Sequence, residues 1–236
     1  MKSKQLIVAL AVGAITASSA VAAEVKEEKN ELDPTKIVTK AGVSYTDALS
    51  VAGSVGLDEA RMLNARVDVE SGEWRLGGSW LFDFGIVNFN FSRTDYEHDA
   101  YRNNYSVGTF IPLEKFGVAP LGIKIFPMAG FNYNDGEYAV QQDSAATLNE
   151  NYVLTPSTST GGYLGAFALK PIDDKFTLMA FGGGAKGSDD YDAYWFGGGA
   201  GYKINDQNSL KFFAFKSDGS FGVEEKIGFG YTHEFD

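Results

Sequence analysis

The chain has 236 residues, no cysteine, 28 glycines, 18 phenylalanines and 12 tyrosines, and a formal net charge of −11. The lack of cysteine excludes a disulfide-stapled scaffold, a thiolate zinc site and a cysteine nucleophile, and the acidic balance argues against nucleic acid as a partner. An apolar share of 44% is too high for a disordered chain, while a mean hydropathy of −0.16 and the lack of a long apolar run after residue 23 exclude a polytopic helical membrane protein.

Residues 1–23 have the pattern of a secretory signal peptide. Two lysines precede an apolar stretch from Leu6 to Ile15, which is too short to span a bilayer core of about 30 Å. Small side chains follow, so we expect cleavage after Ala22 or Ala23 and export across the inner membrane.

Residues 24–60 differ in composition from the rest of the chain. Their first part is charged and contains few branched apolar residues, which is typical of a solvated segment. Further on, Leu49, Val51 and Val55 alternate as in a strand, but residues 57–67 also fit one face of a helix. These two interpretations stay open, and we expect 24–60 to form a periplasmic N-terminal leader.

From residue 62 onward, apolar and polar side chains alternate with a period of two. Val87, Phe89 and Phe91, for example, are separated by polar residues, as in a strand with two unlike faces. Many segments reach the roughly 9–11 residues that a tilted transmembrane strand needs. The expected strands are about 62–70, 73–82, 85–93, 102–112, 119–134, 159–170, 175–186, 191–204, 208–217 and 221–235.

The connections between these strands fall into two alternating groups. Short turns are expected at 83–85, 114–117, 173–174 and 205–208, and longer polar loops at 94–101, 134–159, 186–191 and 217–220. Short turns on one rim and longer loops on the other are typical of outer-membrane barrels. We therefore predict an all-β fold, a closed antiparallel transmembrane β-barrel over 61–236 with about ten strands. A further hairpin within 37–58 would make about twelve strands, and loss of the first two would leave about eight.

The apolar stripes on these strands must be covered by lipid or by a second sheet. Long strands and an export signal favour lipid over a periplasmic β-sandwich. Aromatic residues near strand ends also fit the interfacial girdles of a membrane barrel. These aromatics are Trp74, Trp80, Phe82, Tyr96, Tyr133, Tyr191, Tyr194 and Tyr231.

The end of the chain, from Ile227 to Asp236, carries a family resemblance. It resembles the C-terminal strand of Gram-negative outer-membrane proteins, in which apolar residues alternate and a phenylalanine is last. The matching residues are Ile227, Phe229, Tyr231 and Phe235, and the departures are His233 and the extra Asp236. The resemblance implies location in the cell outer membrane, contact with its lipids, and periplasmic chaperones and the barrel-assembly machinery as partners.

The polar faces of the strands would then line the barrel interior, which we expect to be narrow or plugged at this strand number. We also expect Phe213 and Phe215 to point inward, over glycines of both neighbouring strands. The lumen-facing candidates are Arg66, Asp68, Arg75, Asn88, Asn90, Lys124, Lys203, Lys211 and Lys226.

Catalytic chemistry has little support in the sequence. The two histidines, His98 and His233, are too few for a typical catalytic zinc site, and no nucleophile motif accompanies them. We therefore expect no catalytic residue, no metal and no cofactor. The prediction is a non-enzymatic outer-membrane barrel with a structural or narrow solute-passage role. The alternative is a cell-surface binding or adhesion module that uses the extracellular loop 134–159.

Overall fold

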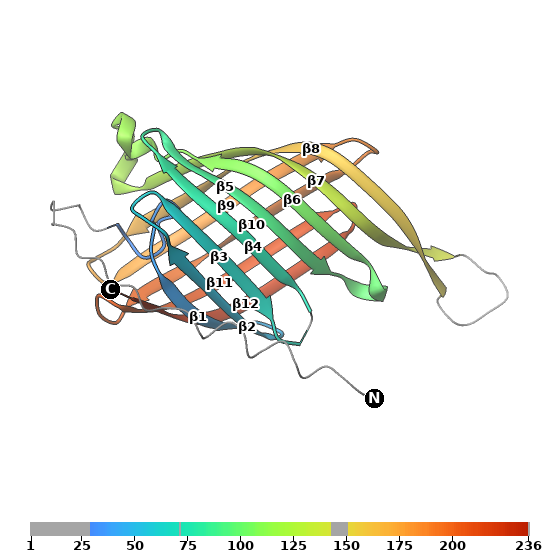
Figure 1. The fold of residues 1–236 in the computed structure, drawn as a ribbon, viewed down its shortest axis with the longest axis horizontal. Helices are drawn as coiled ribbons and strands as arrows, with labels where there is room; N and C mark the ends of the chain where they lie inside the picture. The colour runs from blue at the N-terminus through green and yellow to red at the C-terminus, as the bar shows by residue number, and fades with distance from the viewer. Residues whose placement is uncertain (1–28, 71, 143–150, 236) are drawn as a thin grey trace.

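The computed structural model describes residues 29–70, 72–142 and 151–235, so the expected signal peptide 1–23 lies outside the described residues. Within the described ranges, twelve antiparallel strands close into one barrel, shown in Figure 1. The strands are β1 (Lys40–Tyr45), β2 (Leu49–Gly56), β3 (Arg61–Asp68), β4 (Trp74–Phe82), β5 (Gly85–Asp95), β6 (Tyr101–Phe110), β7 (Lys124–Gln142), β8 (Asn151–Pro171), β9 (Phe176–Gly187), β10 (Asp192–Lys203), β11 (Asn208–Gly219) and β12 (Gly222–Glu234).

The hairpin β1–β2 corrects the expected strand count of about ten and the expected leader. The predicted strands correspond to β3 through β12, and β1 and β2 add the hairpin that was named as the alternative. The barrel therefore begins at Lys40, and the assignment of 40–56 to a periplasmic leader is wrong. The outward residues of this hairpin are apolar but its inward ones are mostly glycine, alanine and serine. Such small residues give a weak alternation signal.

Closure depends on the pairing of the first strand with the last. β1 pairs antiparallel with β12, with Val43 opposite Tyr231, and each strand has two hydrogen-bonded neighbours. No strand in the described chain is left as an open edge, which is the arrangement that a sheet needs in lipid.

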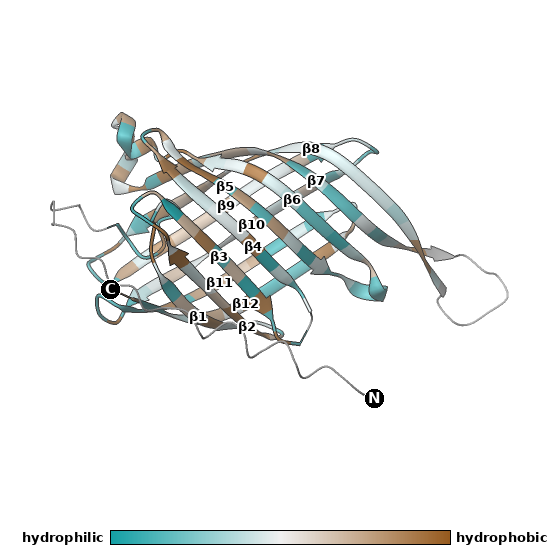
Figure 2. Cartoon of the chain, in the orientation of Figure 1, coloured by the Kyte–Doolittle hydropathy of each residue, from teal (hydrophilic) through white to brown (hydrophobic). Residues whose placement is uncertain are grey.

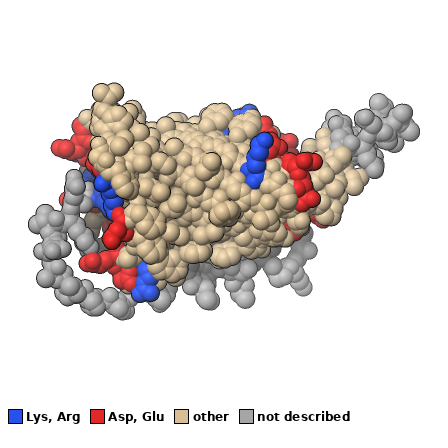
Figure 3. All heavy atoms as spheres, turned by 90° about the horizontal axis from the view of Figure 1, so that it is seen from above, with Lys and Arg blue, Asp and Glu red and all other residues tan. Residues whose placement is uncertain are grey.

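The outer surface of the barrel is an apolar band. Phe131, Leu164 and Phe229 are between 63 and 72% exposed, far more than a soluble protein tolerates over a continuous surface. Brown apolar residues recur along the strands in Figure 2, and the charged residues in Figure 3 gather toward the two ends, with a mostly uncharged wall between them. A sandwich that buries these stripes between two sheets is therefore wrong. No helix among the described residues is long and apolar enough to cross a membrane.

The first strand begins and the last strand ends at one rim of the barrel, where Lys40 pairs with Glu234, and we call this rim the terminal end. The expected short turns all fall at this rim and the expected loops at the other, called the opposite end. The expectation that connections are short at the terminal end and longer at the opposite end is mostly wrong. The connection 111–123 at the terminal end contains two short 3-10 helices, η3 (Leu113–Phe116) and η4 (Pro120–Gly122), whereas β9 and β10 at the opposite end are joined through 188–191 alone.

One hairpin at the opposite end extends far beyond its neighbours, as Figure 1 shows for β7 and β8. The predicted loop 134–159 is largely paired strand, with Asn134 opposite Ser159 and the pairing continuing outward to Gln142 and Asn151. Residues 143–150 lie outside the described residues. The polar sequence looked like a loop because a hairpin beyond the membrane needs backbone pairing but no apolar face.

The expected aromatic girdle is confirmed for part of its members. Trp74, Trp80, Phe82, Tyr133, Tyr194 and Tyr231 are exposed on the described barrel. Tyr191 is instead 5% exposed and packs against Phe221, with Tyr96 beside them. A residue at a strand end can face inward as readily as outward, and the sequence alone does not show which.

Candidate functional site

The barrel interior holds a cavity of about 640 Å³, lined by residues from ten of the strands and by Leu32 of the N-terminal segment. Six of the sequence-predicted lumen candidates lie on its wall. These are Arg66, Asp68, Arg75, Asn90, Lys211 and Lys226.

The other three candidates lie beyond the main cavity. Asn88 accepts a hydrogen bond from Ser79 Oγ at 2.7 Å. Lys124 pairs with Glu114 at 3.0 Å and Lys203 with Asp206 at 2.9 Å, both next to connections of the terminal end. The charges of the two lysines are therefore offset by carboxylates of the turns and contribute less to the electrostatic potential of the cavity.

One wall of the lumen, on β3 through β7, is polar. Residues directly opposite one another on paired strands face the same side of the sheet, and one such row runs Arg66, Arg75, Ser92, Asn104 and Asn134. Within it, Asn104 Nδ2 donates to Asn134 Oδ1 at 2.8 Å. This wall offers amides, hydroxyls and guanidinium groups to a solute.

The facing wall, on β8 through β12, is built from aromatic rings that lie over glycines. A Cβ placed on Gly183 would be 2.5 Å from Trp195 Cζ2, and one placed on Gly197 would be 2.5 Å from Phe181 Cζ. No larger side chain fits beneath these rings without displacing them. Glycine therefore lets the rings lie flat against the sheet, as in other strongly curved sheets.

The expected inward direction of Phe213 and Phe215 is confirmed, because both line the cavity. The Phe213 ring covers Gly228, where a Cβ would be 3.0 Å from Phe213 Cζ. Over β10, the other neighbour of β11, the expectation holds only in part. The side chain closest to Gly199 there is that of Met179, not that of Phe213.

An ion-pair cluster lies near the opposite end of the lumen. Lys226 Nζ is 2.9 Å from Glu73 Oε2 and 2.9 Å from Glu224 Oε1. Burial raises the pKa of the Glu73 carboxyl above its usual range, although the hydrogen bond from Lys226 opposes that shift. The sequence indicated Lys226 but neither of its partners.

An aromatic cluster packs at the same end. Arg102 lies over the Tyr96 ring, 5.8 Å from its centroid, and donates to Tyr191 Oη at 3.5 Å. Burial raises the pKa of Tyr96 to about 12. Arg102 lines the cavity, and its place on a polar strand face was the only sequence signal for it.

The N-terminal segment 29–39 lies against the lumen at the terminal end, a placement that the sequence did not indicate. A Cβ on Gly201 would be 2.8 Å from Leu32 Cδ1, and Gly201 faces the same side as its partner Lys211. Asn30 Nδ2 donates to Thr177 Oγ1 at 2.8 Å. The Leu32 side chain therefore occupies part of the lumen.

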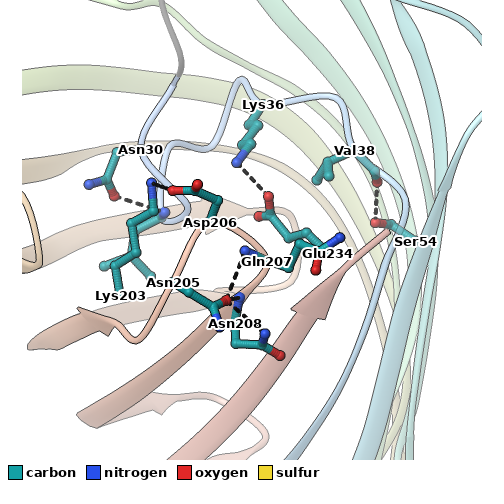
Figure 4. A network of polar contacts seen from close by, with 11 residues as sticks. Asn30, Lys36, Val38, Ser54, Lys203, Asn205, Asp206, Gln207, Asn208 and Glu234 are labelled. Carbon is teal, nitrogen blue, oxygen red and sulfur yellow. Dashed lines mark hydrogen bonds and ion pairs between the residues drawn. The ribbon is translucent and has the colours of Figure 1, made fainter. Parts of the chain in front are cut away.

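Further contacts, shown in Figure 4, hold this segment on the barrel. Lys36 Nζ is 2.6 Å from Glu234 Oε2 on β12, and Ser54 Oγ on β2 donates to the Val38 carbonyl at 2.6 Å. The segment thus contacts strands on different sides of the barrel and narrows its terminal end.

The residues of the expected C-terminal assembly signal face outward. Ile227, Phe229, Tyr231 and Phe235 are all exposed. This is the side on which another protein or lipid could contact them, and their role in assembly stays a prediction.

Neither histidine lies on the cavity wall. His233 Nδ1 is 2.9 Å from Asn208 Oδ1, and the His98 ring stacks on Tyr152 at a centroid distance of 3.7 Å. Across the described ranges, no group of three histidine or acidic residues could hold a metal ion.

No protein-family model and no curated protein sequence matches the chain. Among solved structures, the translocator domain of the autotransporter NalP from Neisseria meningitidis is similar, with a TM-score of 0.52 and 13% identity over 84% of this chain and 85% of that one. An outer membrane channel from Pseudomonas putida F1 matches with a TM-score of 0.47 and 9% identity, over 89% of this chain and all of that one. The KdgM porin matches with a TM-score of 0.42 and 10% identity, over 85% of this chain and all of that one. The chain has the fold of the outer-membrane β-barrels.

Proposed function

We propose that the protein is a passive channel of the outer membrane that lets small hydrophilic solutes cross through its lumen. The observation that carries this proposal is the cavity of about 640 Å³ with a continuous polar wall. Barrels of about eight strands are filled by side chains, whereas porins with about 16–18 strands hold a wide aqueous channel. Twelve strands lie between these cases, which supports a narrow passage.

The outer-membrane location is supported by the apolar band and by the closed sheet. Export through a cleaved signal peptide, which this location requires, remains an expectation from residues 1–23. The lumen wall offers amides, hydroxyls and charged groups of both signs, which supports passage or binding of polar solutes.

A second candidate function is binding at the cell surface. It is favoured by the long hairpin of β7 and β8, whose outer part, from Tyr138 to Gln142 and from Asn151 to Thr155, pairs only with itself. This hairpin presents two paired strands beyond the rim, where a partner could contact them.

Single-channel recording in planar bilayers tests the proposed channel. The folded protein, checked by its heat-modifiable mobility on electrophoresis, is expected to give discrete openings. Asn90→Trp places a large ring on the cavity wall and should lower the conductance. Phe89→Trp, its neighbour on the exposed face, should leave it unchanged. Folded protein that gives no openings would contradict the channel and leave surface binding as the better candidate.

A further inference from the structure

The charge on the lumen wall is opposite in sign to the charge of the chain. The cavity is lined by six basic residues and three acidic ones, whereas the whole chain carries a net charge of −11. The basic set is Arg66, Arg75, Arg93, Arg102, Lys211 and Lys226, and the acidic set is Asp68, Glu73 and Glu224.

Most of the acidic groups on this wall are committed to one lysine. Glu73 and Glu224 both pair with Lys226. Arg93 has its own carboxylate partner, Asp95, at 2.9 Å. What remains is one carboxylate, Asp68, and four cations on the cavity wall.

Two of these remaining cations are directly opposite each other. Arg66 on β3 and Arg75 on β4 are register partners, and like charges in directly opposite positions destabilise a sheet. Arg66 Nη2 donates to the neutral Ser50 Oγ at 2.8 Å, and within the described residues neither guanidinium forms an ion pair with a carboxylate. A repulsive pair is tolerable where water or a mobile anion screens it.

The other two cations extend this positive zone. Lys211 on β11 lies within electrostatic range of the like charges of Lys40 and Arg66. Arg75 is repelled by Arg66 and by Arg102 on β6, and attracted by the Glu224 and Glu73 carboxylates that pair with Lys226. Lys211 also lies 5.7 Å from the centroid of the Phe213 ring. The zone therefore connects the polar wall to the aromatic wall across the lumen.

We infer that the lumen is an anion-selective path, in which Arg66, Arg75, Arg102 and Lys211 attract small solutes that carry a carboxylate or a phosphate. This inference rests on the proposed channel function and names the class of solute. A cleft lined by one sign of charge raises the local concentration of counterions about tenfold or more. Guanidinium groups also bind carboxylates and phosphates through two parallel hydrogen bonds.

The test is the reversal potential of the channel in a gradient of potassium chloride. The wild-type barrel should show the sign for chloride selectivity, and R66E/R75E should lower the chloride-to-potassium permeability ratio by about tenfold or more. Arg61→Glu is the control, because it changes charge at the exposed first residue of β3, outside the cavity wall. A cation-selective wild type, or a ratio that R66E/R75E leaves unchanged, would overturn the inference.

A second measurement does not depend on conduction. Trp195 lines the cavity, so the variant W74F/W80F keeps it as the only tryptophan of the three in the chain. Iodide should quench its fluorescence more strongly than caesium, and R66E/R75E should reduce that difference. Stronger quenching by caesium would refute anion preference even in a protein that gives no current. Stronger quenching by iodide without any current would instead count against the channel alone and leave the anion preference of the lumen intact.

Discussion

The Lys36 ammonium of the N-terminal segment lies 2.6 Å from Glu234 Oε2 on the last strand of the barrel. Both side chains are mostly shielded, at 15% and 13% exposure. This ion pair joins the segment that narrows the lumen to the strand that closes the sheet, so its strength should influence how open the terminal end is.

Loss of this ion pair should open the lumen. Lys36→Met removes the charge at similar length and leaves Glu234 unpaired, which we expect to weaken docking of the segment by about 1–3 kcal/mol. The measurement is single-channel conductance, which should rise, together with faster protease cleavage within 29–39. Lys216→Met is the matched control, since its ion pair with Glu225 lies on the exposed surface. Equal conductance of wild type and Lys36→Met would show that the segment does not limit passage.

The glycine under Trp195 should be required for barrel stability. A Cβ at Gly183 would be 2.5 Å from Trp195 Cζ2 and 2.6 Å from the Leu164 carbonyl oxygen, so Gly183→Ala must displace either the ring or the backbone. We expect it to lower the free energy of unfolding by about 1–3 kcal/mol, measured by urea denaturation in lipid vesicles.

The adjacent glycine provides the comparison for that experiment. Gly182 faces the other side of the sheet, where a Cβ would have no neighbour closer than 3.4 Å. Gly182→Ala should therefore unfold like the wild type. If both variants lose the same stability, the contact with the Trp195 ring is not the cause, because replacing glycine by alanine lowers the entropy of the unfolded chain and would by itself stabilise the barrel.

The turn between β2 and β3 should depend on pH through Asp58. Its carboxylate accepts hydrogen bonds from the amides of Ala60 at 2.9 Å and Arg61 at 2.7 Å, and these, with the Arg61 guanidinium, lower the pKa of Asp58 below 3.8. A carboxyl whose pKa is lowered on folding stabilises the folded form at pH values above 3.8, and this contribution is lost as the pH falls through the lowered pKa.

The amide signals of Ala60 and Arg61 in NMR spectra report this change. They should hold constant from neutral pH down to the region below 3.8 and then shift as Asp58 is protonated. Asp58→Asn keeps a side-chain acceptor but cannot titrate, so its two amide signals should stay constant over the same range. A shift that begins well above 3.8 in the wild type would contradict the lowered pKa.

Shortening the long hairpin should separate the two candidate functions. In the described parts of the hairpin, residues 138–142 and 151–155 pair with no strand but each other. A tight turn in place of this hairpin end removes ring contacts such as that of Tyr152 with His98 but leaves the pairing of β6 with β7 and of β8 with β9 intact. We expect the shortened protein to keep its heat-modifiable mobility and its conductance. If the channel is lost but the barrel still folds, the hairpin contributes to the passage and the division of roles proposed here is wrong.

The sequence determined the kind of sheet and its two faces. Alternation is a local property, because successive side chains of a strand point to opposite sides. The neighbouring residues Phe89 and Asn90 could therefore be assigned to opposite faces, Phe89 to the lipid side and Asn90 to the lumen. The same rule placed Phe213, Phe215 and Lys211 on the inner face and grouped the turns correctly by rim. It left the hairpin of β1 and β2 as an open alternative, because the small residues there give little contrast between the faces.

Only the tertiary structure decided which residues meet inside the barrel. Closure through β1 and β12 fixes the register, and with it the opposition of Arg66 and Arg75 and the position of Trp195 over Gly183. The N-terminal segment has no repeating pattern, and its place in the lumen follows from separate contacts such as Lys36 with Glu234 and Asn30 with Thr177. Such contacts join residues far apart in the chain, so no local pattern can specify them.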